Sequence, residues 1–219
     1  MKICTHHMAI AVHASAGSLR TGITALAVAL LLMGCAFGRT APSDFYMLSP
    51  VAEAASNQNT ATAQRELLVG IGPVAMPSYL DRPQIVTRDG NSVRIELSEF
   101  HRWGEPLENN IPRVLAEDIS RHLNGLRVQV FPARTEDSSD LWVGMDINRF
   151  DGALNGTATL DAWWSIRDAH GKTLLRGRFA ESAPTGDDYA SLVRAESELL
   201  GRFAAQASAA LQRLWYGVQ

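Results

Sequence analysis

Cysteine is scarce in this chain of 219 residues: Cys4 and Cys35 are the only two. If the segment before Cys35 is removed, one cysteine remains and no disulfide can form within a single mature chain. The chain also has no excess of positive charge, because it contains 20 Lys and Arg and 23 Asp and Glu. Nucleic-acid binding would call for clustered basic residues, so we expect no nucleic-acid partner.

Long apolar runs are few, and the most apolar one lies near the start. Ile23–Met33 reads ITALAVALLLM, eleven residues without a charge, and Lys2 and Arg20 precede it. A membrane-spanning helix needs about 20 apolar residues, whereas the apolar part of a secretory signal needs roughly 7–15. We therefore expect residues 1–34 to be a cleaved signal peptide that starts at Met1 or Met8. A short core helix with an inert thiol remains the alternative.

The end of this run is the most specific motif in the chain. Leu32-Met33-Gly34-Cys35 resembles a bacterial lipobox, although Met33 departs from the small or β-branched residue usual at its position. The resemblance implies that Cys35 carries the lipid, palmitate included, and becomes the first mature residue. Ala36 follows instead of the aspartate that often retains lipoproteins at the inner membrane. This favours the outer membrane, with the protein facing the periplasm.

Signatures of catalysis are lacking. Gly70–Ala75 fits a dinucleotide fingerprint, but Pro73 and Pro77 exclude the helix that must follow it. No serine lies in a G-x-S-x-G motif, and His101, His122 and His170 share no metal-ligand spacing. The adjacent pairs Glu117-Asp118 and Asp187-Asp188 are read as a solvated helix face and a helix cap. We expect no enzyme, no cofactor and no metal.

Periodicity predicts the fold class α+β: a single domain in which two main helices cover an antiparallel or mixed sheet. Strands are expected at 66–76, 83–87, 92–98, 127–131, 141–150, 157–168 and 173–182, with a hairpin at Asp89-Gly90. The last three should form an antiparallel meander. Pro112 disfavours an earlier start, so one helix should start near Asn109 or Asn110, either of which is a suitable N-cap, and it should end at Asn124-Gly125. The other should run from Asp188 to Trp215.

The chain divides into three expected parts. Residues 1–34 form the signal peptide, and residues 35–65 hold the lipid anchor, a short strand and a mobile loop. The strand is expected at Phe45–Leu48, docked on the domain, because this segment is too apolar for a simple tether. The loop is expected at Pro50–Gln64, which has hardly any large apolar residue to offset the entropy of ordering. Residues 66–219 form the α+β periplasmic domain.

Several large apolar residues fall on predicted loops. Tyr79 and Leu80 lie between two prolines, and Phe100, Trp103 and Leu107 lie before the first helix. They either cover the core or contact a partner or a second copy of the chain. Tyr79, Leu80, Trp103 and Leu107 are therefore candidate contact residues.

Taken in order, the lipobox, FYMLSP, the segment Val69–Leu123, a strand with two adjacent tryptophans and a long last helix resemble the ABC-type transport auxiliary lipoprotein family, in its PqiC-like branch. The resemblance implies a non-catalytic docking subunit that works with an MCE-domain protein and inner-membrane transporter components in lipid transport between membranes, maintaining membrane integrity. A ring-like homo-oligomer would suit that role. A lipoprotein that binds a ligand or scaffolds another envelope machine is the alternative.

Overall fold

The computed structural model describes residues 41–51, 67–90, 92–123, 128–130 and 139–217. A compact unit begins at Ser43, and the account below concerns that unit. The signal peptide, Cys35, most of the loop 50–64 and the expected helix end at Asn124-Gly125 lie outside the described residues.

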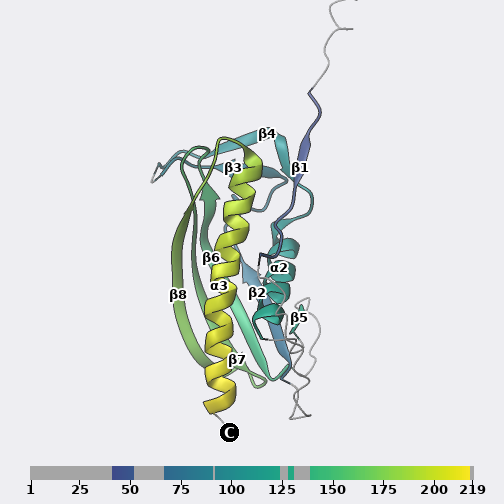
Figure 1. Cartoon of the computed structure of the whole chain (residues 1–219), viewed down its shortest axis with the longest axis vertical. Coiled ribbons are helices and arrows are strands. Elements are labelled where there is room, and N and C mark those ends of the chain that lie inside the picture. The colour runs from purple at the N-terminus through teal and green to yellow at the C-terminus, as the bar shows by residue number, and fades with distance from the viewer. Residues whose placement is uncertain (1–40, 52–66, 91, 124–127, 131–138, 218–219) are drawn as a thin grey trace, which may run out of the picture. The chain divides into compact units, whose positions relative to one another are not determined.

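Within this part of the chain, eight strands form one mixed sheet (Figure 1). They are β1 (Asp44–Tyr46), β2 (Val69–Ala75), β3 (Gln84–Thr87), β4 (Glu96–Trp103), β5 (Val128–Val130), β6 (Leu141–Gly152), β7 (Thr157–Asp168) and β8 (Thr173–Pro184). Their order is β1-β4-β3-β6-β2-β5, and β7 and β8 continue the sheet from β6. The pairs β1–β4, β2–β5, β2–β6 and β3–β6 are parallel, while β3–β4, β6–β7 and β7–β8 are antiparallel.

The meander of β6, β7 and β8 is confirmed, as is the hairpin that joins β3 to β4. In β7, buried and more exposed residues alternate from Thr157 to Arg167, which is the period of two that predicted a strand with one covered face. Gly90 has φ 50°, a left-handed conformation that glycine adopts without steric cost in the connection from β3.

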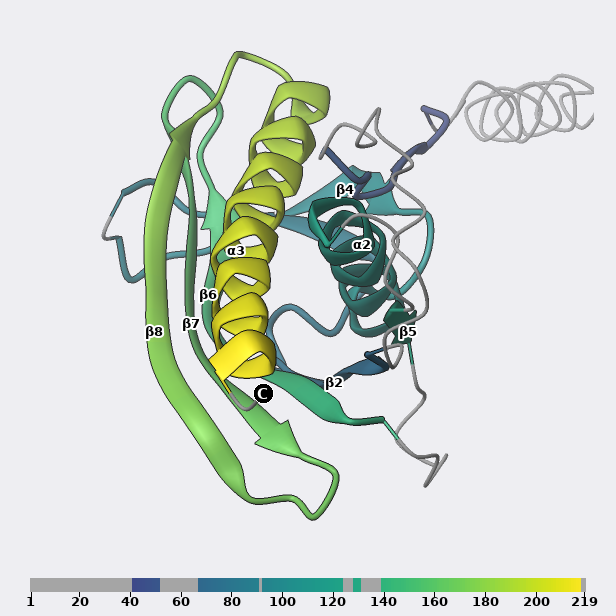
Figure 2. The same cartoon turned by 60° about the horizontal axis from the view of Figure 1, so that its bottom comes forward.

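Two helices, α2 (Leu107–His122) and α3 (Tyr189–Gly217), cover one face of the sheet. Figure 2 shows them side by side within the curve of the sheet. The expected cap of α3 is confirmed, since the Asp188 carboxylate accepts the Ser191 N–H at 2.7 Å and this bond lowers the pKa of Asp188. The expected α+β class, with two helices on a mixed sheet, is confirmed.

The expected start of α2 is wrong. The helix begins at Leu107 with Pro106 at the capping position, and Pro112 lies inside it. Pro112 is the sixth residue of the helix, past its first turn, so it cannot donate the helical hydrogen bond to the Glu108 carbonyl. Asn110 does not cap the helix; it is 1% exposed and serves a tertiary contact described below.

The predicted strand at 92–98 is shifted along the chain. Strand β4 begins at Glu96 and extends to Trp103, so Phe100 and Trp103 belong to a strand and not to a loop. Val93 is fully exposed and precedes the strand, and Leu97 is 43% exposed. The alternation of apolar residues there therefore did not mark a buried face.

Asp118 also corrects the sequence interpretation. Its neighbour Glu117 is exposed and pairs with Arg121 one turn on, as expected of a solvated face. Asp118 itself is 0% exposed and faces the interior.

Candidate functional site

The segment Asp44–Val51, called here the N-terminal strap, connects the expected lipid anchor to the folded unit. Its first part is β1, which pairs in parallel with the end of β4, Asp44 opposite His101 and Tyr46 opposite Trp103. The Gly104 N–H donates to the Tyr46 carbonyl at 2.7 Å and extends this contact past the strand. The expectation of a short docked strand is confirmed, although it begins at Asp44 and ends at Tyr46.

Beyond β1, side chains of the two helices hold the backbone of the strap. The Asn110 amide accepts the Leu48 N–H at 2.8 Å and donates to the Leu48 carbonyl at 3.4 Å. The Ser49 N–H donates to the Ser197 hydroxyl at 3.2 Å, and the Val51 N–H donates to the Asp118 carboxylate at 3.0 Å. Asn110 and Asp118 come from α2 and Ser197 from α3. These polar side chains on the helices therefore provide hydrogen-bond partners for the strap backbone, which no longer pairs with a strand after β1.

Packing follows the same course. Leu48 is 2% exposed and belongs to the core. A Cβ atom at Gly201 of α3 would lie 2.1 Å from Val51 Cγ2, so the absence of a side chain at this position leaves room for the strap. The strap therefore packs as an integral part of the folded unit.

A cluster of rings fixes the start of the strap. The hydroxyl of Tyr46 lies 3.0 Å from His101 Nδ1, and the His101 ring stacks on Tyr189 with 4.0 Å between centroids. Burial, together with the carboxylates of Asp44 and Asp188, raises the pKa of Tyr46. The cluster joins β1, β4 and the first turn of α3.

The candidate contact residues from the sequence are mostly covered, and one of them, Trp103, lies opposite Tyr46 of the strap. Leu80, Trp103 and Leu107 are 3%, 6% and 3% exposed and belong to the core. Tyr79 is half-buried and packs against it. The structure thus places them where the alternative explanation, apolar residues that cover the core, expects them. Cys35 lies outside the described residues.

Tyr79 leads to a buried ionic network that sequence reasoning missed. Its hydroxyl donates to the Asp151 carboxylate at 2.8 Å, and Arg88 and Arg149 approach the same carboxylate at 3.3 and 2.7 Å. Burial, followed by the hydrogen bond to Asp151, raises the pKa of Tyr79 to about 12. Asp151 is 0% exposed and is compensated by two guanidinium groups, as a structural buried charge should be. Tyr79 and Arg88 lie in two different loops, and Arg149 and Asp151 lie on β6, so no local sequence pattern could reveal the network.

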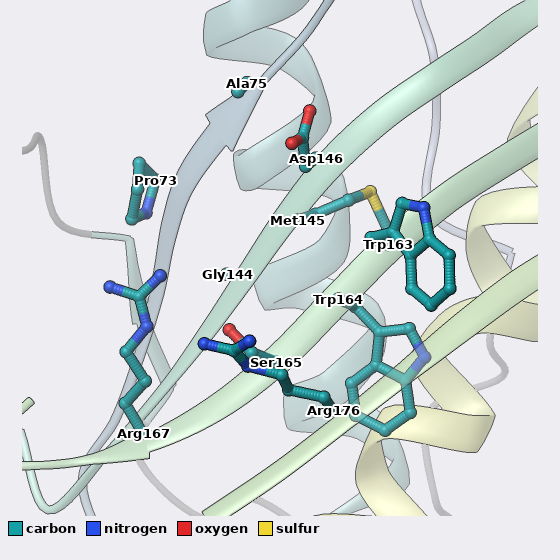
Figure 3. A pocket seen from close by; sticks show the side chains of 10 residues that line it. All are labelled: Pro73, Ala75, Gly144, Met145, Asp146, Trp163, Trp164, Ser165, Arg167 and Arg176. Atoms are coloured by element: carbon teal, nitrogen blue, oxygen red, sulfur yellow. The ribbon is translucent and has the colours of Figure 1, made fainter. Parts of the chain in front are cut away.

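The sheet face away from the helices bears a second candidate site, called here the outer-face hollow. Its volume is about 350 Å³, and Figure 3 shows its lining from β2, β6, β7 and β8. The lining residues are Pro73, Ala75, Gly144, Met145, Asp146, Trp163, Trp164, Ser165, Arg167 and Arg176. Trp163 is 54% exposed, whereas its neighbour Trp164 is 6% exposed and contacts Phe203 of α3 edge-on.

Strict alternation along β7 could have found this surface. Trp164 shares the covered face with Ala162 and Ile166, so Trp163 must share the outer face with Asp161, Ser165 and Arg167. A large apolar ring among polar side chains on an open sheet face is the signal that the sequence offered.

Among the described residues, no group of three or more His, Cys, Asp or Glu side chains is placed to hold a metal ion. Side chains of α2 and α3 offer hydrogen bonds to the strap backbone, and the hollow offers two guanidinium groups, one carboxylate, one hydroxyl and two indole rings. These groups can hold a chain or bind a ligand. Separately, neither α2 nor α3, the helices of the described part, has the length and apolar content needed to cross a membrane.

Comparison with known proteins gives a family match. Residues 46–208 match the family described as ABC-type transport auxiliary lipoprotein component. The matched range begins in the strap and includes the sheet and most of α3. Among curated proteins, none matches the chain.

Solved structures share the fold. One crystal structure of an uncharacterized protein is similar with a TM-score of 0.64 and 18% identity, over 78% of this chain and 99% of the other. A crystal structure of a protein from Xanthomonas campestris is similar with a TM-score of 0.58 and 15% identity, over 76% of this chain and 93% of the other. At these identities the likeness concerns the fold alone.

Proposed function

The chain belongs to the family of ABC-type transport auxiliary lipoprotein components, and on that premise we propose that it is a non-catalytic docking subunit of an MCE-type system that moves lipids between membranes. The observation that carries the proposal is the extent of the family match, which covers 163 residues and includes the strap as well as the domain. The lipobox before Cys35 fits the lipoprotein part of that description.

The proposed location is the outer membrane, with the folded unit in the periplasm. The residue after Cys35 supports this assignment, because it is Ala36 and not the aspartate that often retains lipoproteins at the inner membrane. With Cys35 lipidated, only the eight residues 36–43 would separate the lipid from the strap. A PqiC-like role, with an MCE-domain protein and inner-membrane transporter components as partners, is part of the same proposal, as is assembly of several copies into a ring.

A pull-down from solubilised envelopes tests the proposal. The full-length lipoprotein carries an affinity tag after Gln219, and membranes are solubilised in a mild neutral detergent. We expect an MCE-domain protein to be recovered with it, identified by mass spectrometry. A tagged lipoprotein of unrelated fold, expressed at the same level, is the control.

Two results would count against the proposal. One is recovery of no MCE-domain protein under conditions in which the tagged chain itself is recovered intact. The other is equal recovery with the unrelated lipoprotein, which would show that the contact is not specific to this chain.

A further inference from the structure

The outer-face hollow contains two arginines that share a small area of the sheet. Arg176 on β8 stands opposite Ser165 on β7, and Arg167 lies two residues beyond Ser165. The pairing shifts between Ile166 and Arg167, so the two arginines are near-diagonal neighbours on one face. Side chains at such positions lie within reach of each other when they are long. Figure 3 shows the Arg176 guanidinium beside Ser165, whereas the Arg167 guanidinium lies across Gly144 toward Pro73.

These arginines differ from the other exposed arginine of the same face. Arg178 forms two hydrogen bonds with Asp161, at 2.8 and 2.9 Å, and this pairing lowers the pKa of Asp161. For Arg167 and Arg176, the described residues provide no ion pair. Like charges close together on a strand face repel each other, and no ion pair with a described side chain relieves this repulsion. The pair also stands out in a chain whose net charge is −3.

The floor of the hollow is open above Gly144. A Cβ atom placed there would meet its nearest neighbour, Ser165 Oγ, at 3.6 Å, so a side chain would fit and its absence leaves space. The Trp163 ring and Pro73 form apolar walls. Asp146, the carboxylate in the lining, lies at the end of the hollow away from the two guanidinium groups (Figure 3).

From this arrangement we propose that the outer-face hollow binds a phosphate group between Arg167 and Arg176. A tetrahedral phosphate presents oxygens in several directions and accepts hydrogen bonds from two guanidinium forks at once, with Ser165 as a third donor. A single carboxylate has two oxygens in one plane, so it pairs well with only one guanidinium group. The phosphate satisfies both arginines, and the remaining volume beside Trp163 takes the rest of a phosphate ester.

The same phosphate chemistry has two sources: a free phosphate ester or the head group of a lipid. The full-length mature chain in neutral detergent is titrated at low salt with inorganic phosphate, with glycerol 3-phosphate and with micelles that contain phosphatidylglycerol. Binding is measured by calorimetry and by the rise in Tm, because a ligand that binds only the folded state stabilises it. Tighter binding of the phosphatidylglycerol micelles identifies a head group, whereas equal or tighter binding of glycerol 3-phosphate identifies a free ester.

Matched substitutions assign the binding to the hollow. Arg167→Gln and Arg176→Gln are each expected to weaken binding by about tenfold, the usual effect of losing one charge-assisted contact. Arg178→Gln, which removes a paired arginine from the same face, should leave binding within about twofold of the wild type, a small change on the same scale. In the absence of ligand, Arg176→Gln should also raise Tm slightly at low salt, because it removes the repulsion.

Three results would overturn the inference. The wild-type chain could bind none of the three phosphate probes. Arg178→Gln could weaken binding as much as Arg176→Gln, which would indicate general attraction to a charged surface. A glutamate-rich peptide could bind more tightly than every phosphate probe, which would assign the hollow to an acidic protein partner.

Discussion

At the scale of single residues, two carboxyl groups in the core have opposite surroundings. Asp151 on β6 accepts hydrogen bonds or ion pairs from Tyr79, Arg88 and Arg149. Glu196 on α3 is 1% exposed, and its Oε2 atom has no hydrogen-bond partner among the described residues. Burial raises the pKa of Glu196 well above its usual value, and the negative charge of Asp151 raises it further. Both effects favour the neutral form of Glu196.

This arrangement predicts a pH dependence of stability. The folded chain binds the Glu196 proton more tightly than the unfolded chain, so the free energy of unfolding is greatest below the ordinary glutamate pKa and falls as the pH rises above it. Each unit by which the folded pKa exceeds the unfolded one corresponds to about 1.4 kcal/mol. Glu196→Gln removes the titration, so it should gain stability relative to the wild type between pH 5 and pH 8. Urea unfolding at both pH values measures this.

The control for this prediction lies two residues along the same helix. Glu198 is exposed and pairs with Arg202, so Glu198→Gln should shift stability by a similar amount at both pH values. If Glu196→Gln and the wild type lost stability in parallel from pH 5 to pH 8, Glu196 would not be the titrating group.

At the scale of elements, local patterns predicted some parts of the fold and failed at others for physical reasons. The meander and α3 followed from alternation along β7 and from the cap at Asp188, both of which are local. The start of α2 was missed because Asn110 was read as a local cap. Its partner is the backbone of Leu48, 62 residues away, and no local pattern shows such a contact. Local sequence patterns also could not predict that β2 and β3 pair in parallel with β6, because these strands are far apart in the sequence.

The candidate sites divide in the same way. The docked strand was predictable from the apolar residues after Asp44, because they are too apolar for a tether. The hollow depends on which strands meet, since Ser165 and Arg176 become neighbours only once β7 and β8 pair in this register. Cys35, expected from the lipobox alone, stays a prediction.

The strap offers an element-scale prediction at Asn110. Asn110→Ala leaves the buried N–H and carbonyl of Leu48 without their partner, so we expect a loss of about 1–3 kcal/mol in the free energy of unfolding. The strap should also become more sensitive to protease, because its central attachment to α2 is gone. Chemical unfolding and limited proteolysis of the full chain measure the two effects.

The neighbouring Asn109 is the matched control, since it is exposed on the same turn of α2. Asn109→Ala should change the free energy of unfolding by less than about 0.5 kcal/mol. Equal effects of the two substitutions would mean that the Asn110 amide does not hold the strap.

At the scale of the whole molecule, the proposed lipidation of Cys35 would leave only a short stretch of chain between the lipid and the strap. Eight residues separate Cys35 from Asp44, where β1 begins. Even fully extended, such a segment reaches only about 30 Å. With Cys35 lipidated as proposed, a docked strap would limit the chain between the lipid and the folded unit to this length, and release of the strap would lengthen it.

The anchor itself is tested with the two cysteines of the chain. Cys35→Ser should abolish labelling with radioactive palmitate and release the protein from the outer-membrane fraction, because the acylated residue is gone. Cys4→Ser, the matched control, should keep both the label and the location, since Cys4 belongs to the segment expected to be removed. The Tm of the folded unit should be the same in all three proteins, because the strap contacts begin at Asp44. Labelling that survives Cys35→Ser would place the lipid elsewhere and remove the basis for an anchor at this end of the strap.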